Sequence, residues 1–239
     1  MRATVIFVHG LRTSATMWRH QLAELEAAGI PAVALDLPGH GSRRGERFTM
    51  RGALDAIGEA VDAAPGPPPY LVGFSLGGYL AIEYLARDAR PQRVSGLLAA
   101  SCGTTPTPLV IGAWRVLAKM IRRLPDQGLA LNNLMVRRFV PEPGATDVIA
   151  GGVALDVMDD VLRDLVHLDP VAALPGIAAP ILFVNGRLDH VRWHAARYLR
   201  AARAARLVTV PKATHMVSVT HPDRFTRELL DEYRRVAAP

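Results

Sequence analysis

The sequence predicts a single α/β domain, a mainly parallel doubly wound sheet with an inserted helical cap. Three observations lead to this expectation. Short apolar runs alternate with longer amphipathic stretches, which is the rhythm of strands and helices in a parallel sheet. The rhythm stops between about residues 101 and 179, where only helical patterns occur. A chain of 239 residues, half of them hydrophobic, is long enough to bury one sizeable core.

Short apolar runs in the first part of the chain predict strands at residues 4–8, 32–35, 70–74 and 94–100. The intervening stretches predict helices at residues 16–28 and 50–63, and a third helix that begins directly after residue 75. A proline-rich segment at residues 65–69 ends the second of these helices. Together with residues 180–239, residues 1–101 are therefore expected to form the core of the domain.

Residues 102–179 are expected to form the helical cap. Helical patterns cover residues 111–123, 128–138, 146–154 and 157–165, and a structureless loop of this length inside a domain would be unusual. Strands then resume at residues 181–184 and 207–210, with helices at 192–204 and 222–236.

Composition and charge restrict the possible partners. The formal charge is +6, but the arginines are scattered among acids and no nucleic-acid motif is visible, so we expect no nucleic-acid partner. No apolar stretch approaches the ~20 residues that cross a bilayer, so we expect no membrane insertion, and the apolar start is too short for a signal peptide. The single Cys102 cannot form an internal disulfide, which favours a cytoplasmic location.

The pentapeptide Gly73-Phe74-Ser75-Leu76-Gly77 lies between an apolar run and a helical pattern. A G-x-S-x-G in this context predicts a nucleophile elbow, a sharp turn that holds a serine in strained backbone geometry. The flanking glycines are needed because side chains there would clash. Ser75 is thus the candidate nucleophile.

A serine nucleophile needs a base and a group that orients the base. In this type of fold the acid and then the histidine follow the serine, each after a strand. Asp189 follows the strand at 181–184, and His215 lies between the last strand and the last helix. The rivals fit less well, because Asp164 and Asp169 lie where helical patterns are strongest or ending, His190 and His194 are too near Asp189, and His221 resembles a helix start.

The oxyanion of acyl transfer needs preorganised N–H donors, which we expect from the backbones of Leu76 and Leu11. Leu11 follows the His9-Gly10 turn after the first strand, where His9 would only shape the loop. His190 and His194 have the spacing of two helical metal ligands, but no third ligand is evident and no metal is expected.

These motifs resemble the α/β-hydrolase superfamily, and the resemblance extends from His9-Gly10 through residues 36–41, the elbow and residues 186–189 to His215. It implies a serine hydrolase of a carboxylic ester, thioester or lactone, without a cofactor and with a small-molecule substrate. A cofactor-free lyase of the menaquinone-biosynthesis type, or a ligand receptor that keeps the three residues, is the alternative. The expected pocket residues are Phe74, Trp114, Val191 and Met216.

Arg43, Arg44, Arg47 and Arg51 form the one notable basic cluster. The sharper hypothesis is a clamp for an anionic group of the substrate, such as a carboxylate or phosphopantetheine. The simpler hypothesis, a solvated loop and helix start, is favoured.

Overall fold

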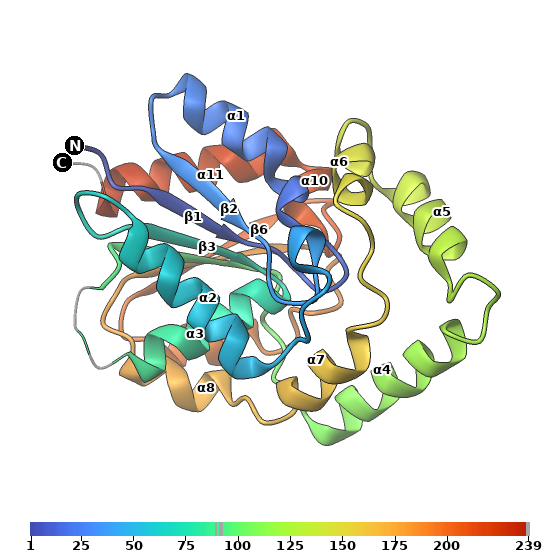
Figure 1. The fold of residues 1–239 in the computed structure, drawn as a ribbon. Coiled ribbons are helices and arrows are strands. Elements are labelled where there is room, and N and C mark those ends of the chain that lie inside the picture. Colours follow the sequence, from blue (N-terminus) through green and yellow to red (C-terminus); the bar gives the residue numbers. More distant parts are fainter. Residues whose placement is uncertain (89, 91–92, 238–239) are drawn as a thin grey trace.

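The structure is a computed structural model and describes residues 1–88, 90 and 93–237. Its sheet has six strands in the order β2-β1-β3-β4-β5-β6, and all neighbouring strands are parallel (Figure 1). The predicted α/β architecture with a parallel sheet is confirmed. The strands are β1 (Val5–Val8), β2 (Ala32–Leu35), β3 (Tyr70–Phe74), β4 (Gly96–Ala100), β5 (Ile181–Gly186) and β6 (Ala205–Val210).

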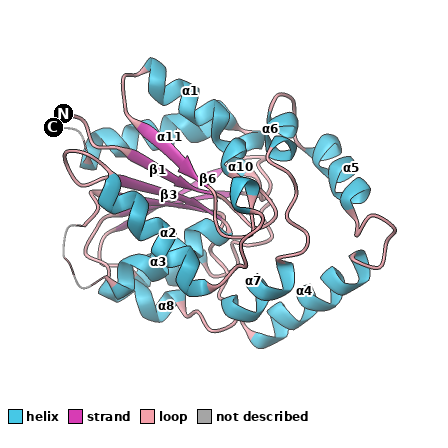
Figure 2. Ribbon diagram, in the orientation of Figure 1, coloured by secondary structure: helices cyan, strands magenta, loops and turns pink. Residues whose placement is uncertain are grey.

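Helices cover both faces of the sheet (Figure 2). One face packs against α1 (Arg19–Ala27) and α11 (Pro222–Val236), and the other against α2 (Met50–Ala63), α3 (Leu76–Arg87) and α9 (Ala195–Ala201). Side chains of a strand alternate between faces, so β1 sends Phe7 to the first side and Ile6 to the second. Both layers are therefore buried, as a doubly wound sheet requires.

The core on the first face centres on Trp18. Its ring lies 4.8 Å from the ring of Phe7 in the sheet and 5.9 Å from the ring of Phe225 in α11, measured between centroids. All three side chains are fully or almost fully buried. Buried aromatic rings contribute much of the apolar area of a core, so this contact fixes α11 against the sheet.

β1 lies between β2 and β3 in the sheet: the chain first crosses from β1 to β2 on one side and then passes from β2 back over β1 to β3. The crossover to β2 contains α1 on one face, and the crossover to β3 contains α2 on the other. The loops that follow β1 and β3 consequently diverge at the carboxyl edge of the sheet. Ligands of open α/β sheets bind at such a switch point.

Between β4 and β5, the inserted segment, residues 101–180, contains five α-helices, and the first four of these are longer than a single turn. In Figure 1, α4 and α5 stand at one end of the molecule, away from the sheet. α4 packs on α7, whereas α5 packs on α6, which also contacts the 3₁₀ turn η1 (Ala15–Trp18). The four longer helices are α4 (Pro108–Ile121), α5 (Leu129–Phe139), α6 (Gly144–Ala150) and α7 (Met158–Leu165).

The inserted segment ends on the core, because the short α8 (Pro170–Ala173) contacts α3 and α9. Local chemistry explains two of the helix starts. The Thr49 side chain accepts a hydrogen bond from the Gly52 N–H and caps α2, and Thr107 caps α4 in the same way with Pro108 at the first position. In the described part of the chain, no helix has both the length and the apolar character needed to cross a membrane.

Several boundaries differ from the sequence prediction. The helix predicted at 16–28 begins with the 3₁₀ turn η1, and the helix predicted at 192–204 is reduced to α9. The last strand begins at Ala205, two residues earlier than predicted. Its first residues were missed because Arg206, exposed at the edge of the sheet, interrupts the apolar pattern of the strand. The sequence pattern also missed α8 and α10 (Val217–Thr220), which are single turns too short to show a periodicity.

Candidate active site

Ser75 lies in the turn between β3 and α3. Its backbone has φ 51° and ψ −113°, a conformation that non-glycine residues rarely adopt. The turn is possible because its neighbours lack side chains. A Cβ on Gly73 would lie 2.5 Å from the carbonyl oxygen of Gly77, and one on Gly77 would lie 2.3 Å from that of Val8. The strained turn at the end of β3 thus has the geometry of a nucleophile elbow.

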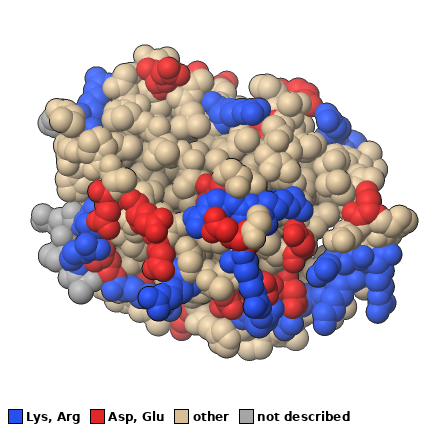
Figure 3. All heavy atoms as spheres, viewed as in Figure 1, with Lys and Arg blue, Asp and Glu red and all other residues tan. Residues whose placement is uncertain are grey.

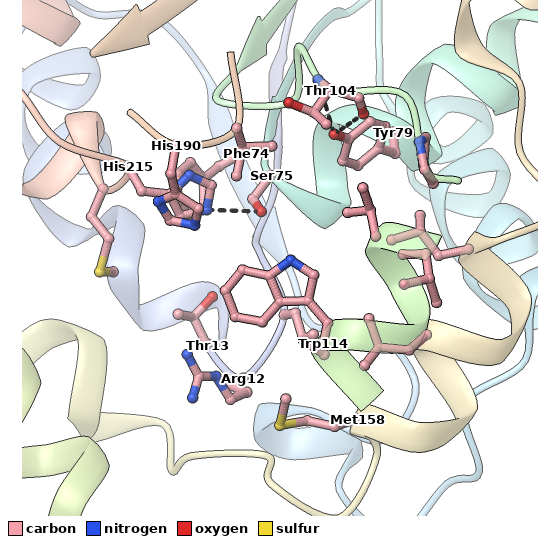
Figure 4. A pocket seen from close by; sticks show the side chains of 18 of the residues that line it. Arg12, Thr13, Phe74, Ser75, Tyr79, Thr104, Trp114, Met158, His190 and His215 are labelled. Atoms are coloured by element: carbon pink, nitrogen blue, oxygen red, sulfur yellow. Dashed lines mark hydrogen bonds between the residues drawn. The ribbon is translucent and has the colours of Figure 1, made fainter. Parts of the chain in front are cut away.

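Two loops bring a histidine and an aspartate to this serine. Nε2 of His215 lies 3.1 Å from Oγ of Ser75, and Nδ1 of His215 lies 3.0 Å from Oδ1 of Asp189 (Figure 4 shows the first contact). An ionised carboxylate can only accept, so Nδ1 carries the proton and Nε2 is left to accept one from the serine. Ser75 can therefore lose its proton to His215 as it attacks.

Asp189 is buried in the loop after β5. Burial opposes its ionisation, but hydrogen bonds from His215 and from the Val191 N–H outweigh this and lower the pKa of Asp189. The carboxylate accepts its backbone hydrogen bond within the loop, from Val191. It does not cap the next helix, because α9 begins only at Ala195. It is thus ionised at neutral pH and can orient the imidazole.

Ser101, at the end of β4, supports the histidine loop and was not singled out from the sequence. Its Oγ donates a hydrogen bond to the carbonyl oxygen of His215 at 2.7 Å, and its N–H donates to Val184 and Asn185. Ser101 also has a positive φ of 53°. The one sequence signal was its place at a strand end beside the elbow strand.

The two expected oxyanion donors lie on either side of the serine. Leu76 is the first residue of α3, and Leu11 lies in the loop after β1. Among the described residues, neither N–H donates to a turn or loop carbonyl. A Cβ on Gly10 would lie 3.4 Å from Cβ of Ser75, which shows how closely this loop approaches the nucleophile.

His9 holds the loop after β1 in place. It is fully buried, its Nδ1 contacts the carbonyl oxygen of Gly10 at 2.8 Å, and its Nε2 accepts from the Leu37 N–H at 3.0 Å. Burial and then the neighbouring His40 lower the pKa of His9 to about 3. A neutral imidazole with the proton on Nδ1 satisfies both contacts. His9 therefore joins the loop after β1 to the loop after β2 through hydrogen bonds.

A cavity of about 600 Å³ opens next to Ser75 and His215. Its walls are mostly apolar and come from the core loops and from α4, α5, α6 and α7. Figure 4 shows the Trp114 side chain extending from α4 toward Ser75. The four expected pocket residues all contribute to this lining, namely Phe74, Trp114, Val191 and Met216.

The elbow helix is tied to the start of the inserted segment near this cavity. The Tyr79 hydroxyl donates to the carbonyl oxygen of Thr104 at 2.6 Å (Figure 4). Cys102, in the same segment, is buried, and burial raises the pKa of its thiol. The thiol therefore stays protonated and unreactive.

The arginine cluster at residues 43–51 does not line the cavity. Arg43 pairs with Glu46, Arg44 and Arg47 pair with acids on the inserted segment, and Arg51 approaches Asp55. Figure 3 shows basic and acidic side chains intermingled over this surface. The ion pairs favour the hypothesis of a solvated surface over that of an anion clamp, because the arginine charges are already matched.

The rival residues have other contacts. Asp164 accepts from the Met50 N–H, Asp169 caps α8, and His221 precedes α11. His194 accepts from the Thr105 N–H at 3.0 Å. None of these contacts involves Ser75.

One group of possible metal ligands overlaps the candidate site. Asp189, His190 and His215 each offer a ligand atom, and these atoms lie within 4.8 Å of one another. Two of the three already form the hydrogen bond between Nδ1 and Oδ1. A metal would have to displace that proton and remove the base from Ser75, so the arrangement fits proton transfer better than metal binding.

A sequence model of the alpha/beta hydrolase family matches residues 5–228 of the chain. Among curated proteins, the chain is 26% identical to the pimeloyl-[acyl-carrier protein] methyl ester esterase of Nitrosospira multiformis, over 95% of this chain and 92% of that protein. It is 28% identical to the enzyme of the same name from Neisseria meningitidis, over 92% and 89% of the two chains.

Solved structures agree at the level of the fold. The chain superposes on an esterase from Exiguobacterium antarcticum with a TM-score of 0.83 at 18% identity, covering 98% of this chain and 93% of that one. A thermophilic esterase from Thermogutta terrifontis gives a TM-score of 0.78 at 22% identity, covering 98% and 90%.

Proposed function

Because the chain belongs to the alpha/beta hydrolase family, we propose that it cleaves its ester through a Ser75-His215-Asp189 triad and an acyl-enzyme intermediate. The broader class, a carboxylic ester hydrolase, follows from the family and from the relatives named as esterases. The observation that carries the proposal is the pair of contacts at 3.1 Å and 3.0 Å on opposite nitrogens of His215.

The reaction begins when Oγ of Ser75 attacks the ester carbonyl carbon and its proton moves to Nε2 of His215. Asp189 stabilises the imidazolium that forms. The carbonyl oxygen becomes an oxyanion, and the N–H groups of Leu11 and Leu76 donate to it. When the tetrahedral intermediate collapses, the ester C–O bond breaks and His215 gives its proton to the leaving alkoxide, which departs as the alcohol.

Water completes the cycle. It attacks the acyl group on Ser75 while His215 accepts one of its protons, and the carboxylic acid leaves as Ser75 regains its hydrogen. Each proton that leaves one oxygen is delivered to another by the same imidazole, so no cofactor is required for the balance of the reaction.

The cavity supports an ester with a medium-length acyl group. Its volume of about 600 Å³ and its mostly apolar lining suit such a chain. Helices α4 to α7 supply much of the lining, so we propose that residues 102–179 act as a substrate-selecting cap on a core of residues 1–101 and 180–239. The relatives named as methyl ester esterases suggest a small alcohol as the leaving group.

Purified protein and its Ser75→Ala variant should be compared on p-nitrophenyl esters of graded chain length, acyl thioesters and lactones. We expect turnover of esters by the wild type and a loss of at least about 1000-fold in the variant. Ser95→Ala is a matched control, since Ser95 lies at the opposite end of β4 and donates to Pro69. Tight ligand binding without any turnover would instead indicate a receptor, and full activity of Ser75→Ala would exclude the proposed nucleophile.

A further inference from the structure

Arg12 places a positive charge inside the candidate pocket, and among the described residues its side chain has no acidic partner. It follows Leu11 in the loop after β1 and contributes to the cavity lining together with Ser75 and His215. Among the described residues that line the cavity, Arg12 is the one arginine, and none is a lysine, aspartate or glutamate. In the view of Figure 4, the Trp114 indole lies between Ser75 and Arg12.

The other half-buried arginines of the described chain are all paired. Arg43 binds Glu46, Arg93 lies 3.5 Å from an oxygen of Asp88, and Arg115 binds Asp159 at 3.0 Å. For Arg12, within the part of the chain that the structure describes, burial is the one influence on the pKa and lowers it, with no acidic neighbour to raise it. A guanidinium remains charged under these conditions, so the pocket holds an unmatched cation.

The backbone holds this side chain in an unusual way. Arg12 has a φ of 68°, in the left-handed region that favours glycine and costs a side-chain-bearing residue about 1 kcal/mol. The loop is fixed by hydrogen bonds from Thr13 to the Gly10 carbonyl oxygen and from the Ala154 N–H to that of Arg12. Strain of this kind clusters at functional sites, and here the strained loop directs an arginine to the pocket.

We propose that Arg12 binds a carboxylate that the substrate carries in addition to its scissile ester, so that the preferred substrates are half-esters of dicarboxylic acids. A guanidinium binds a carboxylate through two parallel N–H···O bonds. Since the lining provides one such cation, a singly charged group fits the site better than a phosphate dianion. The apolar walls contributed by Trp114 and Met158 would contact the methylene chain between the two ends.

This inference rests on the proposed function for the position of the ester, because Leu11 would hold the oxyanion next to Arg12 along the chain. Consecutive Cα atoms are about 3.8 Å apart. The carboxylate and the ester carbonyl would therefore lie in the same cavity, separated by the reach of the Arg12 side chain and joined by a run of methylene groups. The number of these groups sets the chain length that the enzyme prefers.

The kinetic test compares monomethyl adipate, which is anionic, with dimethyl adipate, which has the same chain and no charge. The measured quantity is the kcat/KM for the anionic ester divided by that for the neutral ester. We expect Arg12→Gln to lower this ratio by about 10- to 100-fold, mainly by raising the KM of the anionic ester. Arg12→Lys should recover part of the ratio, because it keeps the charge without the planar fork. Arg51→Gln removes the same charge outside the pocket and should leave the ratio unchanged.

The binding test separates this inference from the proposed function. Calorimetric titration of the Ser75→Ala protein with half-esters from succinate to suberate should show binding that weakens at least about 10-fold when Arg12→Gln is added. Two results would overturn the carboxylate site. One is equal affinity of the half-esters for Ser75→Ala with and without Arg12→Gln, and the other is an equal loss of kcat/KM for the charged and the neutral ester. Binding that depends on Arg12, together with undiminished turnover by Ser75→Ala, would support the site and refute the proposed nucleophile.

Discussion

Lowering the pH should destabilise the protein through His9. The imidazole is fully buried and neutral, and burial lowers its pKa to about 3, below the ordinary value of 6.5. Between these two values the unfolded chain binds a proton at this residue and the folded chain does not. The contribution of His9 to stability is therefore fully present above about pH 6.5 and is lost progressively as the pH falls toward 3, and below that pH this group causes no further loss.

The size of the effect follows from the difference between the two pKa values. Each pKa unit corresponds to about 1.4 kcal/mol, so His9 should reduce the free energy of unfolding by about 2 kcal/mol at pH 5. The full difference of 3.5 units, from 6.5 to about 3, corresponds to about 5 kcal/mol. This is comparable to the entire stability of many domains, so His9 alone could trigger acid unfolding.

Urea unfolding followed by fluorescence at several pH values would measure the effect, since Trp18 is buried beside the same sheet. His9→Gln should have a shallower dependence of unfolding free energy on pH between 6.5 and 4.5, whereas the exposed His167→Gln should resemble the wild type. Identical slopes for all three proteins would refute the reasoning. If His9→Gln does not fold, an NMR titration of the wild type decides, because an imidazole of His9 that protonates near pH 6 contradicts the account.

Three further predictions concern the site. Asp189→Asn should lower kcat by about 10³- to 10⁴-fold with little change in Tm, because the amide no longer enforces the tautomer of His215, and an ester assay with a melting curve tests this. Gly77→Ala should lose more than about 4 kcal/mol of stability or fail to fold, because its Cβ would lie 2.3 Å from a backbone oxygen of Val8, and urea unfolding would show it. Removal of metal ions with EDTA should leave ester turnover unchanged, and a loss restored by zinc would instead indicate that Asp189, His190 and His215 bind a metal.

Much of the fold could be predicted because local patterns determine it. The run from Tyr70 to Phe74 is entirely buried and leads directly into α3, and such a strand-turn-helix is visible in the letters alone. The expected chain order of serine, aspartate and histidine directed attention to two loops. The structure brings those loops to the same edge of the sheet, because all six strands are parallel.

Other features depend on contacts between distant residues and leave no local pattern. The ion pairs that occupy Arg44 and Arg47 join residues more than 100 positions apart in the chain. Likewise, Ser101 supports His215 through a hydrogen bond across 114 positions. Arg12 could not be recognised as unpaired until its surroundings were known, since an arginine in a loop is ordinarily solvated.

Covalent labelling at Ser75 tests the central claim most directly. A fluorophosphonate reacts with an activated serine, so intact-mass measurement of the wild type should show a single adduct that peptide mapping assigns to Ser75. The adduct should be absent from Ser75→Ala and greatly slowed in His215→Ala, because the base that activates the hydroxyl is missing. An adduct on another serine, or labelling of Ser75→Ala at the rate of the wild type, would contradict the proposed mechanism.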